Sequence, residues 1–166
     1  MKYWFSYVLI AFSVIACAQK DTSSNVEEQN LYTGEKVEKT VAEWSAVLSP
    51  EVFHVMREEG TERAFTSDLL NIKEEGTFVC NACGLPLFAS ETKFKSGTGW
   101  PSFYAPIDST YVGEISDTSY GWSRVEVVCN RCDSHLGHVF EDGPKPTGLR
   151  YCINGVCLKF EPAKKP

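Results

Sequence analysis

The sequence predicts a mostly β domain of antiparallel sheets, with short helices confined to its N-terminal side. From Gly76 onward, short segments of β-branched and aromatic residues alternate with polar residues, and glycine, proline, aspartate and serine separate them. No regular helical segments alternate with these strands, and two Cys-x-x-Cys motifs each end one of them. This pattern is typical of antiparallel sheets joined by tight turns rather than of strand–helix–strand units.

Four segments are expected to form strands because of this composition. They are Gly76–Cys80, Ser123–Cys129, Gly137–Phe140 and Leu149–Phe160. A short helix is expected before them, because Ser49 is a typical N-cap and Pro50 and Glu51 suit the first helical turn. Phe53 and Met56, three residues apart on this helix, would face the core.

The first 16 residues are expected to be a signal peptide. Met1 and Lys2 precede an apolar run that ends at Ala16, which is short for a membrane span and suits a secretory signal. Small residues then lead into Cys17, as in the lipidation box of bacterial lipoproteins. We therefore expect a lipid on Cys17 and a protein anchored in the cell envelope after export, on the periplasmic side or outer surface. The alternative is an ordinary signal peptide followed by an incidental cysteine.

The remaining chain divides into a tether and one domain. Residues 17–40 are polar and poor in large apolar groups, so they are expected to be a flexible tether. Residues 41–166 are expected to form the folded domain, which we predict to be a monomer. The chain has 16 Lys and Arg against 22 Asp and Glu, a formal charge of −6. Because this charge repels phosphate backbones, nucleic acid is excluded as a partner.

Four cysteines predict a structural zinc site with one ion per chain. Two residues separate Cys80 from Cys83, and two separate Cys129 from Cys132. This spacing lets both thiolates of a pair bind one tetrahedral ion, and four such ligands are typical of structural Zn²⁺. The alternatives are disulfides or a redox-active Cys-x-x-Cys, but a redox pair normally begins a helix and neither motif here does so. With four cysteines bound, the zinc would have no position open for a substrate.

Three short segments concentrate reactive or sterically special residues: Ser96–Phe103, His135–His138 and Arg150–Asn154. The first is rich in glycine but lacks the lysine of a phosphate loop, so nucleotide binding is not expected. It presents Trp100 from a turn followed by proline, where an indole ring can form an apolar wall. The alternative is an ordinary core tryptophan.

The domain resembles a known family from about Trp44 to Pro162. Four motifs, in the family's order, carry the resemblance to the zinc-containing methionine-R-sulfoxide reductases (methionine sulfoxide reductase B): LSPEVFHVMREEGTERAF, KEEGTFVCNACGLPLFASETKFKSGTGWPSF, VEVVCNRCDSHLGHVFEDGP and LRYCINGVCLKF. The resemblance implies thiol-dependent reduction of methionine-R-sulfoxide for the repair of oxidised proteins. It alone implies the preference for the R epimer, and it leaves open whether protein-bound or free sulfoxide is the better substrate.

Cys152 is the expected nucleophile of this reaction, and the thiolate is the attacking form. The product would be a Cys152 sulfenic acid, the first reversible step of cysteine oxidation. Arg150 would lower the pKa of Cys152 if the segment is extended, because residues two apart then share a strand face.

The other motif residues match groups that the family uses around its nucleophile. His135 and His138 would protonate the sulfoxide oxygen, and Asn154 would orient one of them or hold that oxygen. Trp100 would form the wall of a slot for the substrate methyl group, with Phe103 behind it.

The thiol that resolves the sulfenic acid differs from the common family pattern. Many members carry a resolving cysteine where this chain has Thr98, so Cys157 becomes the candidate, with a thioredoxin-like protein as the final reductant. Asn154-Gly155 is a strong hairpin signal, and a two-residue hairpin would place Cys152 opposite Cys157. The alternative is a continuous strand, which would put the two sulfurs far apart and leave Cys157 as a buried apolar residue.

Two other functions compete with this interpretation. One is a zinc-ribbon adaptor that uses the four cysteines only for stability, and the other is a disulfide oxidoreductase that acts through one Cys-x-x-Cys. Neither accounts for the ordered match of all four motifs.

Overall fold

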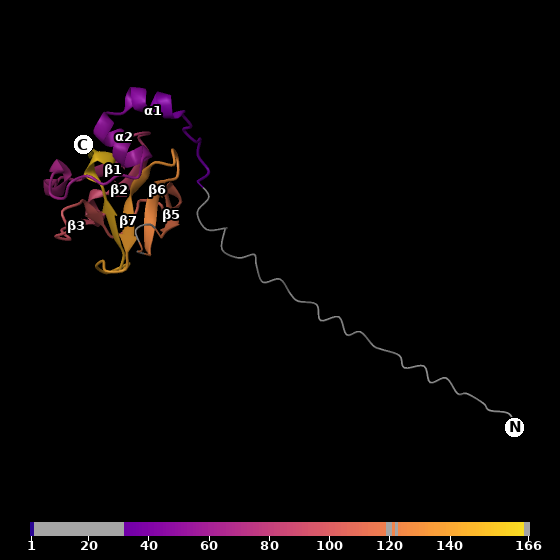
Figure 1. Ribbon diagram of the computed structural model, residues 1–166. Helices are drawn as coiled ribbons and strands as arrows, with labels where there is room; N and C mark the ends of the chain where they lie inside the picture. Colours follow the sequence, from indigo (N-terminus) through magenta and orange to yellow (C-terminus); the bar gives the residue numbers. More distant parts are fainter. Residues whose placement is uncertain (2–31, 119–120, 122, 165–166) are drawn as a thin grey trace.

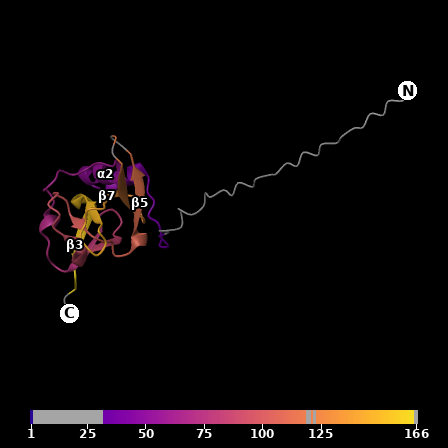
Figure 2. The same cartoon turned by 90° about the horizontal axis from the view of Figure 1, so that it is seen from below.

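Two antiparallel sheets form the domain, and two short helices lie at one end of them (Figure 1). The computed structural model describes residue 1, residues 32–118, residue 121 and residues 123–164. The smaller sheet has the strand order β2-β1-β9 and the larger one β3-β4-β8-β7-β6-β5. In both Figure 1 and the perpendicular view of Figure 2, β3 and β5 lie on opposite sides of the domain, as expected for the two edges of the larger sheet. The predicted mostly β class is confirmed.

The bounds of the elements follow the chain in this order. The α-helices are α1 (Val41–Val47) and α2 (Pro50–Arg57). The strands are β1 (Gly76–Cys80), β2 (Pro86–Ala89), β3 (Lys93–Phe94), β4 (Ser102–Phe103), β5 (Val112–Asp117), β6 (Arg124–Cys129), β7 (His135–Phe140), β8 (Arg150–Ile153) and β9 (Leu158–Pro162). The 3₁₀ turns are η1 (Asp68–Asn71), η2 (Ser90–Thr92), η3 (Ser109–Tyr111) and η5 (Gly155–Cys157).

The helix predicted from Ser49 is confirmed. The Ser49 hydroxyl accepts a hydrogen bond from the Val52 N–H, and Pro50 occupies the first turn of α2. Met56 is buried in the core, whereas Phe53 is only partly buried against it. The preceding helix α1 was not predicted as a separate element; Thr40 and Glu43 form a capping box at its start.

The segment Leu149–Phe160 forms neither the hairpin nor the continuous strand that its sequence allows. Strand β8 ends at Ile153, the turn η5 follows, and β9 then joins the other sheet. Asn154 has φ −61° and ψ 128°, whereas the favoured Asn-Gly hairpin turn needs a positive φ. The hairpin prediction is therefore wrong, and the chain crosses from one sheet to the other immediately after the predicted nucleophile.

An aromatic cluster fills the space between the two sheets. Phe78 of β1 and Phe88 of β2 lie 5.0 and 4.4 Å from Phe103 of β4, measured between ring centroids. All three side chains are fully buried. Burial of such rings is the main source of stability for a domain of this size.

Part of the segment predicted as a tether lies against the domain. The Val37 N–H donates to the carbonyl of Arg131 at 2.8 Å, and the Lys36 ammonium pairs with Asp133 at 2.9 Å. The Tyr32 ring meets Tyr111 edge-on, with centroids 6.1 Å apart. The predicted boundary at residue 41 therefore marks the first helix rather than the first contact with the domain.

The predicted signal peptide, apart from Met1, and the predicted lipidation site at Cys17 lie outside the described residues. Within the described part of the chain, no helix has the length and apolar character needed to cross a bilayer.

Candidate functional site

The four predicted zinc ligands come together in one cluster. The sulfurs of Cys80, Cys83, Cys129 and Cys132 all lie within 4.8 Å of one another. The Cys80–Cys132 and Cys83–Cys129 sulfur pairs are 3.7 and 3.6 Å apart. A tetrahedral zinc site with Zn–S bonds of about 2.3 Å has sulfur–sulfur edges of about 3.8 Å. The cluster therefore fits a tetrahedral metal ion bound by four thiolates.

The two Cys-x-x-Cys loops share the sequence Val-Cys-Asn-x-Cys and the same backbone hydrogen bond. The Gly84 N–H donates to the carbonyl of Cys80, and the Asp133 N–H donates to that of Cys129, both at 2.8 Å. Gly84 and Asp133 both adopt a positive φ, 75° and 53°. Because β1 and β6 belong to different sheets, a metal ion in this cluster would join the ends of the two sheets.

The predicted nucleophile lies in a row of residues that face each other across four strands. Ser102 of β4, Cys152 of β8, His138 of β7 and Glu126 of β6 are directly opposite one another in register. Opposite residues point to the same face, with Cβ atoms about 4.5–5.5 Å apart. A Cβ on Gly137 would lie 2.1 Å from the Cys152 carbonyl oxygen, so glycine is needed for β7 to approach β8 this closely.

The Cys152 thiol is half-buried next to a hydroxyl. Its sulfur lies 3.7 Å from the Thr98 hydroxyl oxygen. Thr98 is the residue that stands where many family members were said to carry a resolving cysteine. Burial raises the pKa of Cys152 above its ordinary value, while the Thr98 hydrogen bond and the Arg150 charge oppose this rise. The predicted effect of Arg150 on the thiol thus has the expected direction but does not dominate. Its guanidinium also binds both carboxylate oxygens of Asp142, at 2.8 and 3.0 Å.

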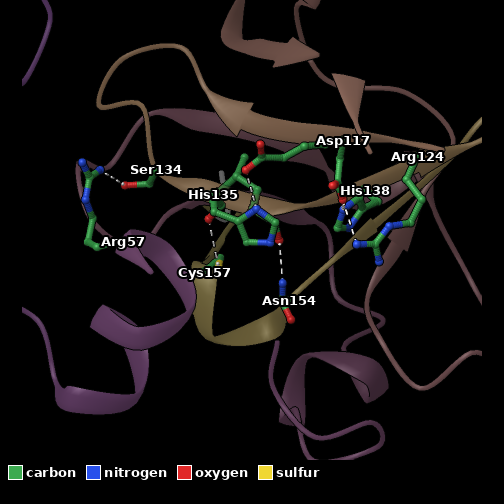
Figure 3. Close-up of polar contacts among 10 residues, drawn as sticks. Arg57, Asp117, Arg124, Ser134, His135, His138, Asn154 and Cys157 are labelled. Atoms are coloured by element: carbon green, nitrogen blue, oxygen red, sulfur yellow. Dashed lines mark hydrogen bonds and ion pairs between the residues drawn. The ribbon is translucent and has the colours of Figure 1, made fainter. Parts of the chain in front are cut away.

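The two predicted histidines lie beside each other, and a carboxylate holds each of them (Figure 3). The His135 Nδ1 lies 2.6 Å from Glu126, and the His138 Nε2 lies 2.9 Å from Asp117, which also pairs with Arg124 at 2.7 Å. The ring centroids are 5.6 Å apart. The Nε2 of His135 is buried and has no hydrogen-bond partner among the described residues.

The two histidines line a cavity of about 920 Å³ that also reaches His54. Burial lowers the pKa of His138 below its ordinary value, and the positive charge of Arg124 acts in the same direction; the hydrogen bond from Asp117 opposes them. A lowered pKa favours the neutral imidazole, which can accept a proton.

Asn154 holds the backbone between the two histidines rather than a histidine ring. Its side-chain N–H donates to the carbonyl of Leu136 at 3.1 Å, and its oxygen accepts the N–H of Glu62 at 3.1 Å. The residue is only 4% exposed. The predicted orienting role is therefore indirect in this structure, through the position of β7.

Trp100 is partly buried and lines a cavity of about 1070 Å³, together with Gly99 and Pro101. Its indole N–H donates to the carbonyl of Glu62 at 3.3 Å. Pro101 follows in the chain and accepts a hydrogen bond from the N–H of Ile153, next to Cys152. Trp100 is therefore not a fully buried core residue, and its place as the wall of a substrate slot stays a prediction.

Phe103 is not part of this site. Strand alternation turns Ser102 toward the face of Cys152 and Phe103 toward the opposite face, where it pairs with Tyr151. Phe103 is fully buried and stacks on Phe88 in the core. Its predicted place behind the substrate slot is wrong, because the residue supports the sheet from the other side.

Cys157 is fully buried in the turn η5, and its thiol lies 3.5 Å from the carbonyl of His135. Burial raises the pKa of this thiol well above its ordinary value, and the nearby charge of Glu62 adds to the effect. The hairpin that would have placed Cys157 opposite Cys152 is absent, so its predicted resolving role no longer has a geometric argument.

Three carboxylates of the site were missed from the sequence: Glu62, Asp117 and Glu126. Glu126 belongs to a predicted strand, where alternate residues point to the same face. Knowledge of the strand register would have placed Glu126 on the face of Cys152, but the sequence does not give that register. Glu62 and Asp117 are far from the three motif segments, and only the fold brings them there.

Comparison with known proteins agrees with this geometry. The model of the SelR domain family matches residues 48–162. The chain belongs to the SelR family. It is 59% identical over 128 residues to the peptide methionine sulfoxide reductase MsrB of Pseudomonas putida W619, covering 77% of this chain and 96% of that protein.

Relatives of the same name come from other organisms as well. The MsrB of Methanosarcina barkeri Fusaro is 61% identical over 125 residues, which cover 75% of this chain and 88% of that protein. The MsrB of Acinetobacter baylyi is 53% identical over 130 residues, or 78% of this chain and 94% of that protein. The predicted family is thus confirmed, and this SelR protein is an oxidoreductase.

Proposed function

We propose that this protein reduces methionine-R-sulfoxide in oxidised proteins to methionine, with Cys152 as the nucleophile. The observation that carries the proposal is the register that sets a half-buried Cys152 directly opposite His138, beside the loop of Trp100. The names of the MsrB relatives support the substrate class. An apolar wall, a thiol and two acid–base groups are the parts that this reaction needs.

In the proposed reaction the Cys152 sulfur attacks the sulfoxide, and the oxygen moves to Cys152. The S–O bond of the substrate breaks, an S–O bond to Cys152 forms, and the thiol proton ends on the sulfenic acid oxygen. The substrate gains two electrons and becomes a thioether, while Cys152 loses two. In this proposal Trp100 contacts the substrate methyl group, and the His135 imidazole, whose buried Nε2 has no partner among the described residues, serves the departing oxygen.

His138, opposite Cys152 on β7, is proposed to carry the proton in this reaction. Asp117 holds its Nε2, and the cavity that it lines gives access to water. A neutral imidazole in that position can receive the proton of the Cys152 thiol and return it as the oxygen leaves. Arg150 contributes a positive charge that favours the thiolate.

We infer that the metal of the four-cysteine cluster is one structural Zn²⁺ per chain. The sulfur–sulfur distances match the tetrahedral geometry that zinc prefers. Four thiolates would fill all four coordination positions of the ion and leave none for a substrate. When bound, the ion supplies cross-linking of the two sheets and takes no part in the reaction.

A thioredoxin-like protein is proposed to restore the enzyme by direct attack on the sulfenic acid. An external thiol forms a mixed disulfide with Cys152 and releases water, and a second thiol then frees Cys152. Cys152 is half-buried and reachable in this way, whereas Cys157 is fully buried.

The apolar leader and Cys17 favour a lipoprotein of the cell envelope. We propose that it acts there as a monomer on oxidised envelope proteins. Growth of expressing cells with labelled palmitate should label the wild-type protein and leave Cys17→Ser unlabelled. Equal labelling of the two proteins would contradict lipidation at Cys17.

The activity is tested with separated R and S epimers of dabsyl-methionine sulfoxide and excess dithiothreitol. We expect consumption of the R epimer alone, and complete loss of turnover in Cys152→Ser. If a folded, metal-loaded protein consumes neither epimer, the reductase function is wrong and a zinc-ribbon adaptor becomes the better interpretation.

A further inference from the structure

One buried carboxylate connects three parts of the site that are distant in sequence. Glu62 is 5% exposed and lies in the loop between α2 and η1. Its carboxylate accepts the backbone N–H of Gly155 at 2.6 Å and that of Val156 at 2.9 Å. These two N–H groups belong to the turn that directly follows β8, the strand of Cys152.

The backbone of Glu62 contacts the two other parts. Its N–H donates to the side-chain oxygen of Asn154, and its carbonyl accepts the indole N–H of Trp100. The loop is also tightly packed against the turn, since a Cβ on Gly155 would lie 2.0 Å from the Ser67 hydroxyl oxygen. The same residue thus touches the proposed methyl wall and the segment that carries the nucleophile.

We propose that Glu62 is a positioning residue that sets the distance between Trp100 and Cys152, and thereby the width of the methyl slot. This proposal rests on the function proposed above. The carboxylate fastens the loop to the turn after Cys152, and the loop carbonyl fastens the indole. A change in the carboxylate therefore moves the wall relative to the nucleophile, without changing a group that touches the substrate.

This anchoring needs two acceptor oxygens, and not only a side chain of the right shape. A carboxylate has two acceptor oxygens for the two N–H groups, whereas a glutamine amide of the same size has one oxygen and one donor group. In Glu62→Gln one buried N–H therefore faces another donor, and the loop must shift to relieve the conflict. A shift of about 1 Å in a positioned group can cost about 100-fold in rate.

The test compares two substrates that differ by one methylene. Full-length wild type, Glu62→Gln and Glu62→Asp are assayed on N-acetyl-methionine sulfoxide and N-acetyl-ethionine sulfoxide with dithiothreitol. One methylene in a fitted pocket changes kcat/KM by about 10- to 200-fold. We expect wild type to have the higher kcat/KM on the methyl substrate. In both variants kcat/KM on the methyl substrate should fall about 10- to 100-fold, and the fall on the ethyl substrate should be several-fold smaller.

The selectivity ratio separates positioning from a purely structural role. A loss of folded protein lowers both rates equally, and it would appear in the circular dichroism and metal content of the variant. An unchanged methyl-to-ethyl ratio in both variants, or full activity in a folded Glu62→Gln, would overturn the proposal. Glu62→Asp keeps both acceptor oxygens on a shorter side chain. If the glutamine variant does not fold, the methyl-to-ethyl ratio of kcat/KM is measured on Glu62→Asp instead.

Two controls complete the design. Glu74→Gln removes an exposed carboxylate by the same change and should keep wild-type rates and selectivity. If wild type reduces neither sulfoxide, the proposed function itself fails, and this outcome is distinct from a wild type that is active but whose Glu62 variants keep its selectivity.

Discussion

His138 lies directly opposite Cys152 in the antiparallel pair of β7 and β8. Its partner on the far side is Glu126 of β6, while its Nε2 is held by Asp117 at the end of β5. The sheet register itself thus brings the imidazole to the sulfur, and the carboxylate fixes the orientation of the ring.

Replacement of Asp117 by asparagine should lower the pKa of His138 further. The carboxylate favours the charged imidazole, so its loss leaves burial and the Arg124 charge unopposed. The NMR titration of His138 should move to lower pH, and the acid limb of the kcat/KM profile should move with it. Asp133→Asn, at an exposed position, should leave both unchanged. A midpoint that rises or stays in place in Asp117→Asn would contradict the assignment.

Thr98→Val should make the Cys152 thiolate harder to form. The Thr98 hydroxyl is the strongest of the influences that lower the pKa of this cysteine, so its removal raises that pKa further above the ordinary value. Alkylation of Cys152 by iodoacetamide should be slower at every pH below its midpoint, which should lie higher than in wild type. Thr66→Val, on the exposed surface, is the matched control. Identical alkylation profiles would show that the 3.7 Å contact has no effect on ionisation.

Cys157→Ala should not prolong the life of the Cys152 sulfenic acid. The Cys157 thiol is fully buried, its pKa is raised, and the described chain has no hairpin that sets it opposite Cys152. After one equivalent of methionine-R-sulfoxide, dimedone should label wild type and Cys157→Ala to the same extent, as read by mass spectrometry. Stronger labelling of the variant would restore Cys157 as the resolving thiol.

Cys83→Ser should remove the metal and unfold the domain. Binding of structural zinc by four thiolates is worth about 10–16 kcal/mol in small peptides, which is as large as the whole stability of a typical domain. Elemental analysis should give one zinc per wild-type chain and far less in the variant, with a large fall in Tm. Cys157→Ala changes a buried cysteine outside the cluster and should keep its zinc. A stable, metal-free Cys83→Ser would contradict a structural role for the ion.

Local patterns in the sequence were sufficient for β1, β6 and β7 and for the four clustered cysteines, whereas β2, β3, β4 and β5 were not predicted. The strand Gly76–Cys80 was predicted with its observed bounds, because β-branched and aromatic residues alternate up to a Cys-x-x-Cys loop. The loops themselves are local structures, so their spacing alone identified the four ligands.

The errors arise where distant residues override a local preference. Asn154-Gly155 has the strongest hairpin propensity in the chain, but Glu62, more than 90 residues away, binds the N–H groups of Gly155 and Val156. Phe103 was assigned to the wrong face because the register of β4 against β8 was unknown.

The crossing of the chain between the two sheets, directly after Cys152, ties the reaction to the integrity of the whole domain. Fraying of β9 from β1 would pull on η5 and so on the end of β8. We therefore expect that opening of β9 displaces the nucleophile as well. As the denaturant concentration rises, turnover should be lost at the same midpoint as the hydrogen-exchange protection of the most protected amides. Enzyme activity would then report the cooperative unfolding of the whole domain.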